Sequence, residues 1–289
     1  MPKEKRFIIY VDWNVIVEFI SNNFRNLHSV LKRHKEANKI FIPFSSEHVE
    51  EATKIKLESE EKTRNEIRKR LKYISELSSN LYFVNNMTDT KFCIKHPLEV
   101  YNTITEVDLG GFDFYKLFSE MVNYDSLKQY REFFGIYSNE LNNMSTSEVI
   151  PKLDEILNSN RQENGQQVSI KSLIKEATKI SDQEHGKYEY HQIMTRKRTF
   201  QINVLINCIF SLLDSFGFWP DKKVTYKKGS RCIDCRHAFN GSFADAVISN
   251  DRRFCKKTEA VYEYLQLETK VFYISEDEQN LLEFIKSAI

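Results

Sequence analysis

Three aspartates stand where strands end or helices begin, which is where a parallel α/β sheet collects ligands. Asp12 follows an apolar run, Asp234 begins a short helical stretch, and Asp251 follows a second apolar run. Clustered carboxylates raise one another's pKa unless a cation neutralises them, and such hard oxygen ligands suit Mg²⁺ or Mn²⁺. These metals polarise a phosphate and generate hydroxide from bound water, so the spacing predicts phosphate chemistry. Taken singly, each aspartate could instead be a helix N-cap.

A fourth carboxylate is expected on the helix that follows the predicted strand Lys39–Ser45. This helix carries Glu47, Glu50 and Glu51 in its first turns, and Glu47 and Glu51 lie on the same helix face one turn apart, so either or both could belong to the site. Either residue could instead complement the positive end of the helix dipole. Asp245, inside the predicted strand Ala244–Ser249, is either a fifth metal ligand or an exposed residue.

Two histidines and one asparagine lie close in sequence to the proposed ligands. His48 and His237 are each one helical turn from an acid, and Asn14 is two residues after Asp12. A histidine in such a place could act as acid or base toward a phosphate, or could hydrogen-bond a ligand. We expect the second role, or a plain structural one. Asn14 and Glu47 are likewise expected to hydrogen-bond a ligand or to act as acid or base.

Short apolar runs separated by helical patterns predict an α/β fold with a central parallel sheet flanked by helices. The runs of strand length are Arg6–Val11, Lys39–Ser45, Leu81–Val84, Ala244–Ser249 and Lys270–Ser275. The stretches with a helical pattern are Ser46–Ser79, Phe112–Phe134, Glu148–Leu157, Ser169–Ile180, Tyr190–Phe216, Asp234–Asn240, Glu259–Leu265 and Glu276–Ala288. The polar composition of Asn158–Gln167 predicts an exposed loop.

Three stretches, taken in order, resemble the PIN-like nucleases, in particular the larger bacterial members with a helical insertion. The stretches are IIYVDWNVI (Ile8–Ile16), PFSSEHVEEA (Pro43–Ala52), and IDCRHAF followed by ADAVISNDRRF (Ile233–Phe254). The resemblance implies a Rossmann-like PIN-type sheet that gathers acids around Mg²⁺ or Mn²⁺ to cleave phosphodiester bonds, usually in RNA. It assigns the ligand role to Asp12, Glu51, Asp234 and Asp251. Members of that family have similar Ser-x-x-His and Asp-x-x-His patterns, which match His48 and His237, and some have an acid at the position of Asp245.

The resemblance covers the two ends of the chain. Residues 1–90 and 195–289 are therefore expected to form the nuclease domain, and residues 91–194 a helical insertion. The insertion could grip substrate, bind a protein partner or form a homo-oligomer. The expected function is a divalent-metal-dependent endoribonuclease, in keeping with a toxin or a phage-defence effector. The alternatives are a structure-specific DNA nuclease on the same acids and a non-catalytic PIN-like scaffold that binds nucleic acid or protein.

Positive charge surrounds two of the three aspartates. Between Lys222 and Lys257 the sequence has ten Lys or Arg residues and three Asp residues. Such a flank would hold the phosphates of a nucleic acid, RNA in the first place and DNA as the alternative. The alternative interpretation is that these residues simply solvate loops beside the sheet. The residues assigned to phosphate binding are Lys227, Lys228, Arg231, Arg252, Arg253, Lys256 and Lys257.

The composition is that of a globular chain without a membrane span. Hydrophobic residues make up 41% of the 289 residues and charged residues 29%, and the net charge of +1 neither requires nor excludes nucleic acid. The longest apolar runs are only a few residues, and the first residues lack the apolar segment of a signal peptide. Five cysteines, an odd number, give no disulfide framework. We therefore expect a reducing, cytoplasmic location and no membrane partner.

Overall fold

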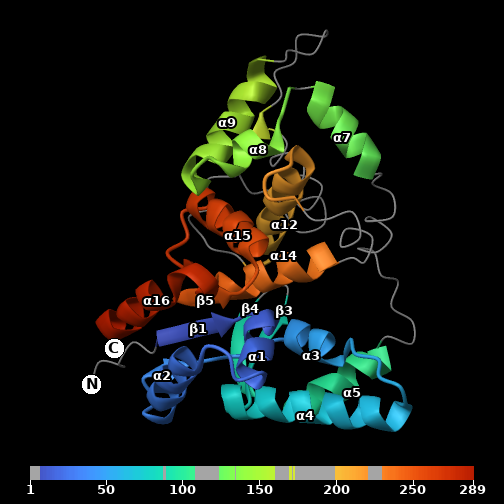
Figure 1. Ribbon diagram of the computed structural model, residues 1–289, viewed down its shortest axis with the longest axis vertical. Helices are drawn as coiled ribbons and strands as arrows, with labels where there is room; N and C mark the ends of the chain where they lie inside the picture. The colour runs from blue at the N-terminus through green and yellow to red at the C-terminus, as the bar shows by residue number, and fades with distance from the viewer. Residues whose placement is uncertain are drawn as a thin grey trace.

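The computed structural model describes residues 7–86, 89–107, 124–133, 135–159, 169–170, 172, 199–220 and 230–289. Its centre is a four-stranded parallel sheet with the strand order β2-β1-β5-β6 (Figure 1). The strands are β1 (Phe7–Val11), β2 (Ile40–Phe41), β5 (Ala246–Ser249) and β6 (Lys270–Tyr273). The expected central parallel sheet flanked by helices is therefore confirmed.

The order of the strands reverses between β1 and β5. From β1 the chain moves outward to β2 on one side, whereas from β5 it moves outward to β6 on the other side. Val11 lies opposite Ile248 in the register. Asp12, after β1, and Ser249, at the end of β5, are therefore at the same carboxyl edge. In sheets of this kind, ligands bind at the carboxyl edge where the strand order reverses.

Two apolar cores cover the two faces of the sheet, because successive side chains of a strand point to opposite faces. Tyr10 and Val247 belong to one core, whereas Val11 and Ile248 belong to the other. The helices of the first core are α9 (Thr146–Ser159), α12 (Thr199–Phe216), α14 (Ser230–Gly241) and α15 (Arg252–Tyr264). Those of the second are α1 (Trp13–Ile20), α2 (Arg25–Glu36), α3 (Ser46–Thr53), α4 (Glu60–Ser78) and α16 (Ile274–Ala288). Figure 1 shows α9, α14 and α15 on one side of β1, and α1, α3 and α4 on the other.

The predicted strand Leu81–Val84 is a strand, but it lies outside the central sheet. As β3 (Leu81–Asn86) it pairs antiparallel with β4 (Asp89–Ile94). A single parallel bridge joins Tyr82 of β3 to Phe44, beyond the end of β2. The predicted strand before α3 shrinks to the two residues of β2, and Pro43 cannot donate a hydrogen bond to continue it.

The predicted helices are present where the structure describes them, with shifted ends. The stretch Ser46–Ser79 is two helices, α3 and α4, and α15 begins at Arg252 rather than Glu259. Helix α7 (Tyr124–Phe133) is the described part of the predicted helix Phe112–Phe134. Most of Ser169–Ile180 and Asn158–Gln167 lies outside the described residues. Among the helices that are described, none has both the length and the apolar character needed to cross a membrane.

The described part of residues 91–194 packs against both ends of the chain. Strand β4 runs across the expected boundary at residue 90, and α5 (Pro97–Val107) packs on α3 and α4. Helix α9, which follows the short α8 (Ser138–Asn142), packs against α15, and α7 contacts α12. These helices therefore extend both cores.

A buried ion pair joins α12 to α15. The Nζ of Lys257 lies 3.5 Å from Oδ1 of Asp214 and 5.5 Å from the centre of the Phe210 ring. Lys257 is 0% exposed. The prediction that Lys257 binds nucleic acid is therefore wrong, because its ammonium group cannot reach a phosphate in solvent.

Replacing Lys257 by Met should strongly destabilise the fold. The substitution removes the ammonium group that faces the buried carboxylate of Asp214, and breaking a buried ion pair costs about 3–5 kcal/mol of unfolding free energy in comparable cases. The matched control is Lys256→Met, which removes a half-exposed ion pair with Glu259 and should cost no more than about 1 kcal/mol. Urea unfolding measures both values, and similar losses in the two variants would contradict this role of the buried pair.

Candidate metal centre

Asp12 ends β1 and caps α1, and only 6% of the residue is exposed. Its backbone N–H donates to the carbonyl of Ile248 at 2.9 Å, which extends the pairing of β1 with β5. Its Oδ1 accepts the N–H of Trp13 at 2.7 Å, so the alternative role as a helix cap is realised. A cap places a carboxylate at the positive end of the helix and leaves its other lone pairs available.

Two further side chains hold the second oxygen of Asp12. Asn14 donates from Nδ2 to Oδ2 of Asp12 at 2.6 Å, and Ser249 donates from Oγ to the same oxygen at 2.6 Å. Asn14 also accepts the backbone N–H of Asn250 at 2.7 Å. Asn14 thus supports the proposed ligand by hydrogen bonding, as expected, and it fixes the carboxylate across the junction of β1 and β5.

Helix α3 carries three glutamates that meet different partners. Glu47 accepts a hydrogen bond from Nδ2 of Asn240 at 2.7 Å, and Glu50 accepts one from Arg236 at 2.6 Å. Both partners belong to α14, so these two glutamates tie α3 to α14. Glu51 remains as the glutamate that meets the other candidate ligands, and the geometry favours it over Glu47.

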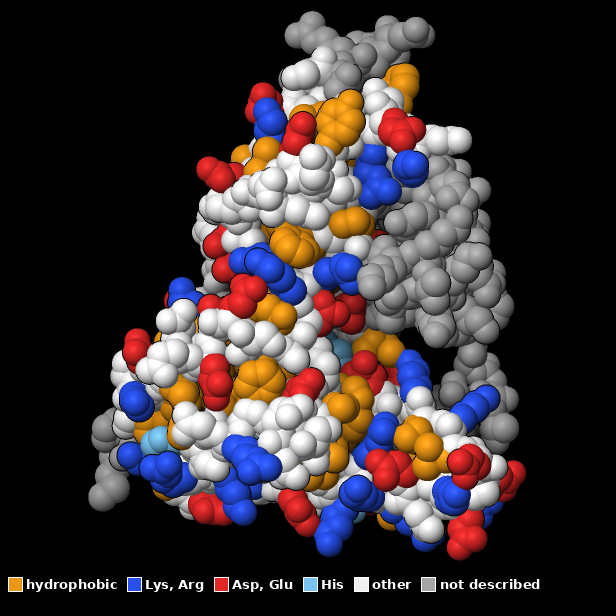
Figure 2. All heavy atoms as spheres, viewed as in Figure 1, with side chains coloured by type: hydrophobic (Ala, Val, Ile, Leu, Met, Phe, Trp, Pro, Cys, Tyr) orange, Lys and Arg blue, Asp and Glu red, His pale blue; other side chains and the backbone are white. Residues whose placement is uncertain are grey.

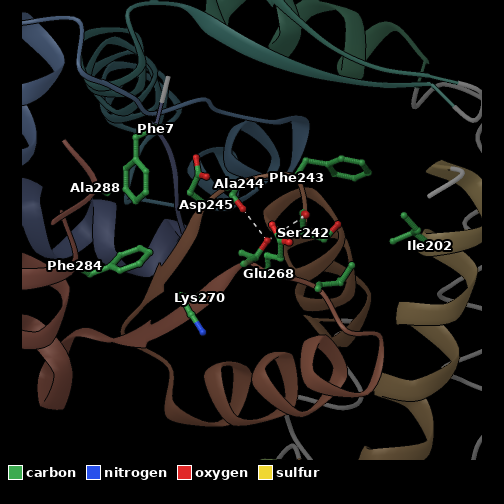
Figure 3. Close-up of a pocket in the computed structure, with 12 residues that line it drawn as sticks. Phe7, Ile202, Ser242, Phe243, Ala244, Asp245, Glu268, Lys270, Phe284 and Ala288 are labelled. Carbon is green, nitrogen blue, oxygen red and sulfur yellow. Dashed lines mark hydrogen bonds between the residues drawn. The ribbon is translucent and has the colours of Figure 1, made fainter. Parts of the chain in front are cut away.

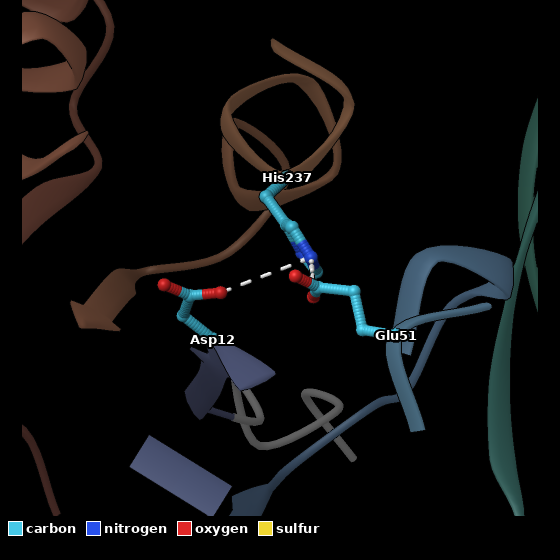
Figure 4. A group of neighbouring side chains, drawn as sticks. All are labelled: Asp12, Glu51 and His237. Carbon is cyan, nitrogen blue, oxygen red and sulfur yellow. Dashed lines mark hydrogen bonds and ion pairs between the residues drawn. The ribbon is translucent and has the colours of Figure 1, made fainter. Parts of the chain in front are cut away.

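Asp12, Glu51 and His237 converge on one point (Figure 4). The Nε2 of His237 lies 2.7 Å from Oε2 of Glu51 and 3.8 Å from Oδ1 of Asp12. One ligand atom from each residue lies within 4.8 Å of the other two, which makes this the group of described side chains suited to a metal ion. The three residues come from β1, α3 and α14, so the tertiary fold alone brings them together.

Burial and mutual attraction set the charges of this group. Burial raises the pKa of Asp12 from 3.8 to about 6, although His237 opposes that rise. Burial by itself lowers the pKa of His237, but the Glu51 and Asp12 carboxylates outweigh it and raise the pKa to about 9. Without a metal, His237 is therefore a buried imidazolium that is attracted to both carboxylates and offsets part of their charge.

His48 has a structural role. It is 0% exposed, and burial lowers its pKa to about 3, so its ring is neutral. Its Nε2 donates to the carbonyl of Val11 at 2.7 Å, and its Nδ1 accepts the backbone N–H of Ser45 at 3.0 Å. Ser45 and His48 form the capping box of α3. The histidine fixes α3 to β1 and does not reach a substrate.

Asp234 and Asp251 do not belong to the group of three. Asp234 is half-buried on α14, one turn before His237. Asp251 is exposed and caps α15, where its Oδ1 accepts the N–H groups of Arg253 and Phe254 at 2.8 and 3.2 Å. Its backbone N–H donates to Ser249 at 3.0 Å, so Asp251 is still connected to Asp12 through one serine.

Asp245 lies at the opposite edge of the sheet, so its predicted place among the metal ligands is wrong. It precedes β5, and its Oδ2 accepts the N–H of Ile8 at the beginning of β1 at 2.8 Å. Asp245 instead lines a cavity of about 570 Å³ together with Phe7, Phe243 and Lys270 (Figure 3).

The predicted basic flank is only partly available to a ligand. Arg252 lies 3.2 Å from Glu276, and Lys256 lies 3.0 Å from Glu259. Arg252 and Arg253 both retain exposed surface beside Asp251. Lys227, Lys228 and the side chain of Arg231 lie outside what the structure describes. Figure 2 shows Lys and Arg side chains interspersed with Asp and Glu over α2 and α4, so on that face basic charge is not confined to one patch.

Sequence reasoning missed several residues that build the site. Arg236 and Asn240 lie four residues apart on one face of α14, a spacing that indicates a face buried against another element, and His237 was expected beside a ligand rather than as one. Ser249 and Tyr10 gave no signal of their own, because their partners are 237 and 227 residues away.

No family model, curated protein or solved structure matches this chain.

The raised pKa of His237 predicts a pH-dependent stability in EDTA. The pKa rises from 6.5 to about 9 on folding, so its stabilising contribution is complete below pH 6.5 and is lost as the pH rises through 9. Glu51→Gln removes the carboxylate that raises this pKa most, and should reduce the loss of unfolding free energy between pH 7 and 9.5. The exposed substitution Glu58→Gln is the control. An equal pH dependence in wild type and Glu51→Gln would contradict the assigned charge.

Proposed function

We propose that the chain is a divalent-metal-dependent nuclease that holds its metal with Asp12, Glu51 and His237 and cleaves RNA. The observation that carries this proposal is the convergence of two carboxylates and one imidazole within 4.8 Å, at the edge where the strand order reverses. The PIN-like resemblance of the sequence points to the same edge. Asp234 and Asp251 lie near it in the chain, and they are candidates for contacts with the metal's water ligands rather than with the metal itself.

The side chains fit a divalent cation. Placing the buried Asp12 beside the partly buried Glu51 is costly unless a positive charge accompanies them. Two oxygen ligands suit Mg²⁺ or Mn²⁺, and the added imidazole favours Mn²⁺ of the two, because Mg²⁺ strongly prefers oxygen ligands. Asn14 and Ser249 orient Asp12 in the way that hydrogen-bonding partners orient metal ligands in other proteins.

The exposed surface of each side chain indicates its role at the site. When bound, the metal polarises a phosphate and makes a bound water more acidic. Asp12 and His237 are buried, whereas the Glu51 side chain is 26% exposed, so a substrate approaches from the Glu51 side. Arg252 and Arg253 lie at the beginning of α15, beside the same sheet edge, and bind the flanking phosphates.

A metal-free scaffold is the second candidate, and one observation favours it. His237 already supplies a positive charge to Asp12 and Glu51, so part of the negative charge of the group is balanced without a metal. Such a protein would bind nucleic acid or protein without cleaving it. A structure-specific DNA nuclease would use the same three residues, so the test below includes DNA.

Cleavage by the purified protein should require Mn²⁺ or Mg²⁺ and should favour single-stranded RNA. Asp12→Asn and Glu51→Gln remove a ligand each and should lower the cleavage rate by more than roughly 100-fold. Glu263→Gln, exposed on α15, should cleave as the wild type does. Labelled RNA and DNA are digested in parallel with each metal and with EDTA. Cleavage of DNA alone would identify the DNA nuclease, and equal activity in Asp12→Asn would contradict the assigned site.

Affinity for RNA should depend on salt through Arg252 and Arg253. Each phosphate contact on a single strand contributes a slope of about −0.7 to the plot of log affinity against log salt. The double variant Arg252→Ala/Arg253→Ala should therefore flatten the slope by about 1.4 and leave Mn²⁺ binding intact. The control is Arg64→Ala/Arg68→Ala on the exposed side of α4, which removes the same charge. Flattening in the control instead would place the RNA path over α4.

A further inference from the structure

A chain of buried hydrogen bonds leads from the backbone of β1 to the imidazole of His237. The hydroxyl of Tyr10 lies 2.8 Å from Nδ1 of His237 and 2.8 Å from Oγ of Ser45. Ser45 Oγ lies 3.0 Å from Nδ1 of His48, whose Nε2 donates to the carbonyl of Val11. Tyr10, Ser45, His48 and His237 are each at most 1% exposed.

The donors and acceptors of this chain follow from its two ends. A carbonyl only accepts, so Nε2 of the neutral His48 ring carries the proton, and its Nδ1 accepts the backbone N–H of Ser45. At the other end, Nε2 of His237 needs a free lone pair to bind a metal, so the ring proton is on Nδ1 and Nδ1–H donates to the Tyr10 oxygen. The Tyr10 hydroxyl then donates to Oγ of Ser45.

We propose that Tyr10 is a positioning residue that holds His237 by Nδ1–H and so presents Nε2 of His237 to Asp12 and Glu51. This inference rests on the proposed function, because Nε2 matters there as the ligand of a metal. The same arrangement of hydrogen bonds serves both states of the site. In the metal-free protein Nε2–H donates to Glu51, and with a metal bound Nε2 offers its lone pair, while Nδ1–H stays on Tyr10 in both.

The position of Tyr10 in the sheet makes it suited to this role. It alternates with Ile9 and Val11 along β1, so its ring packs in the core that contains α14. Its ring centre lies 5.0 Å from that of His48 and 5.7 Å from that of His237. The ring is therefore fixed by packing, and its hydroxyl is fixed with it. A ligand held by a rigid partner loses less entropy when it binds a metal.

The test uses Tyr10→Phe, which keeps the ring and removes only the hydroxyl. Mn²⁺ affinity, followed by the electron paramagnetic resonance signal of free Mn²⁺, should fall about 10- to 100-fold. The control is Tyr73→Phe on α4, which removes a half-buried hydroxyl that lies 3.1 Å from Nε2 of another histidine, His28 on α2. Ser45→Ala, which removes the acceptor of Tyr10, should give a smaller loss and serves if Tyr10→Phe does not fold.

A second measurement separates this inference from the proposed function. In EDTA at pH 6.5, proton NMR should show a slowly exchanging Nδ1–H of His237, assigned by its absence in His237→Gln and lost in Tyr10→Phe. If the wild type binds Mn²⁺ and Tyr10→Phe binds it equally well, the inference is overturned and the proposed metal site stands. If the wild type does not bind Mn²⁺, the proposed function fails. In that case an unchanged Nδ1–H signal in Tyr10→Phe overturns the inference as well.

Discussion

The site depends on the charge balance between the buried carboxylate of Asp12, the partly buried carboxylate of Glu51 and one imidazolium. Asp12 and Glu51 come from different elements, and placing their charges side by side is costly without a nearby positive charge. His237 supplies that charge at 2.7 Å from Glu51. The cost of separating these charges holds β1, α3 and α14 in one arrangement. The same attraction that stabilises the metal-free protein thereby prepares a ligand set for a divalent cation, which would replace the proton on His237.

A second layer of polar contacts keeps this charge balance in place. Arg236 and Asn240 bind Glu50 and Glu47, so α14 is joined to α3 by two further contacts. His48 joins α3 to β1 through the carbonyl of Val11. These contacts explain why acids that look equivalent on α3 have different roles. Two of them fix the helix, and one remains for the site.

The fold and part of the site follow from the sequence for physical reasons. Buried parallel strands are apolar throughout, so Arg6–Val11 and Ala244–Ser249 indicated β1 and β5, and the end of the first strand located Asp12. Asp245 could have been excluded in the same way. It lies at the beginning of the strand, whereas the site lies at its end, and a strand rises about 3.3 Å for each residue between them. The choice of Glu51 over Glu47 depends on which glutamate is hydrogen-bonded to α14. Glu47 binds Asn240 of α14, and the sequence pattern around Glu47 does not reveal that contact.

Charge alone misled the prediction of the basic flank. Lys257 has the same local pattern as Lys256, yet its partner Asp214 is 43 residues earlier in the chain and draws it into the interior. Likewise, His237 was expected beside a ligand, whereas the fold places it between two carboxylates. Both cases depend on residues that meet only after the helices pack on the sheet.

The most direct test of the account is whether Mn²⁺ binds to the nitrogen of His237. Pulsed electron paramagnetic resonance of the Mn²⁺ complex detects coupling to a directly bound nitrogen, and histidine labelled with ¹⁵N identifies its source. The account predicts a histidine coupling in the wild type that is absent in His237→Gln, while the substitution of half-exposed His96 by Gln leaves it unchanged. A Mn²⁺ complex with oxygen ligands only, or no complex at all, would contradict the assignment of Asp12, Glu51 and His237 as the metal site.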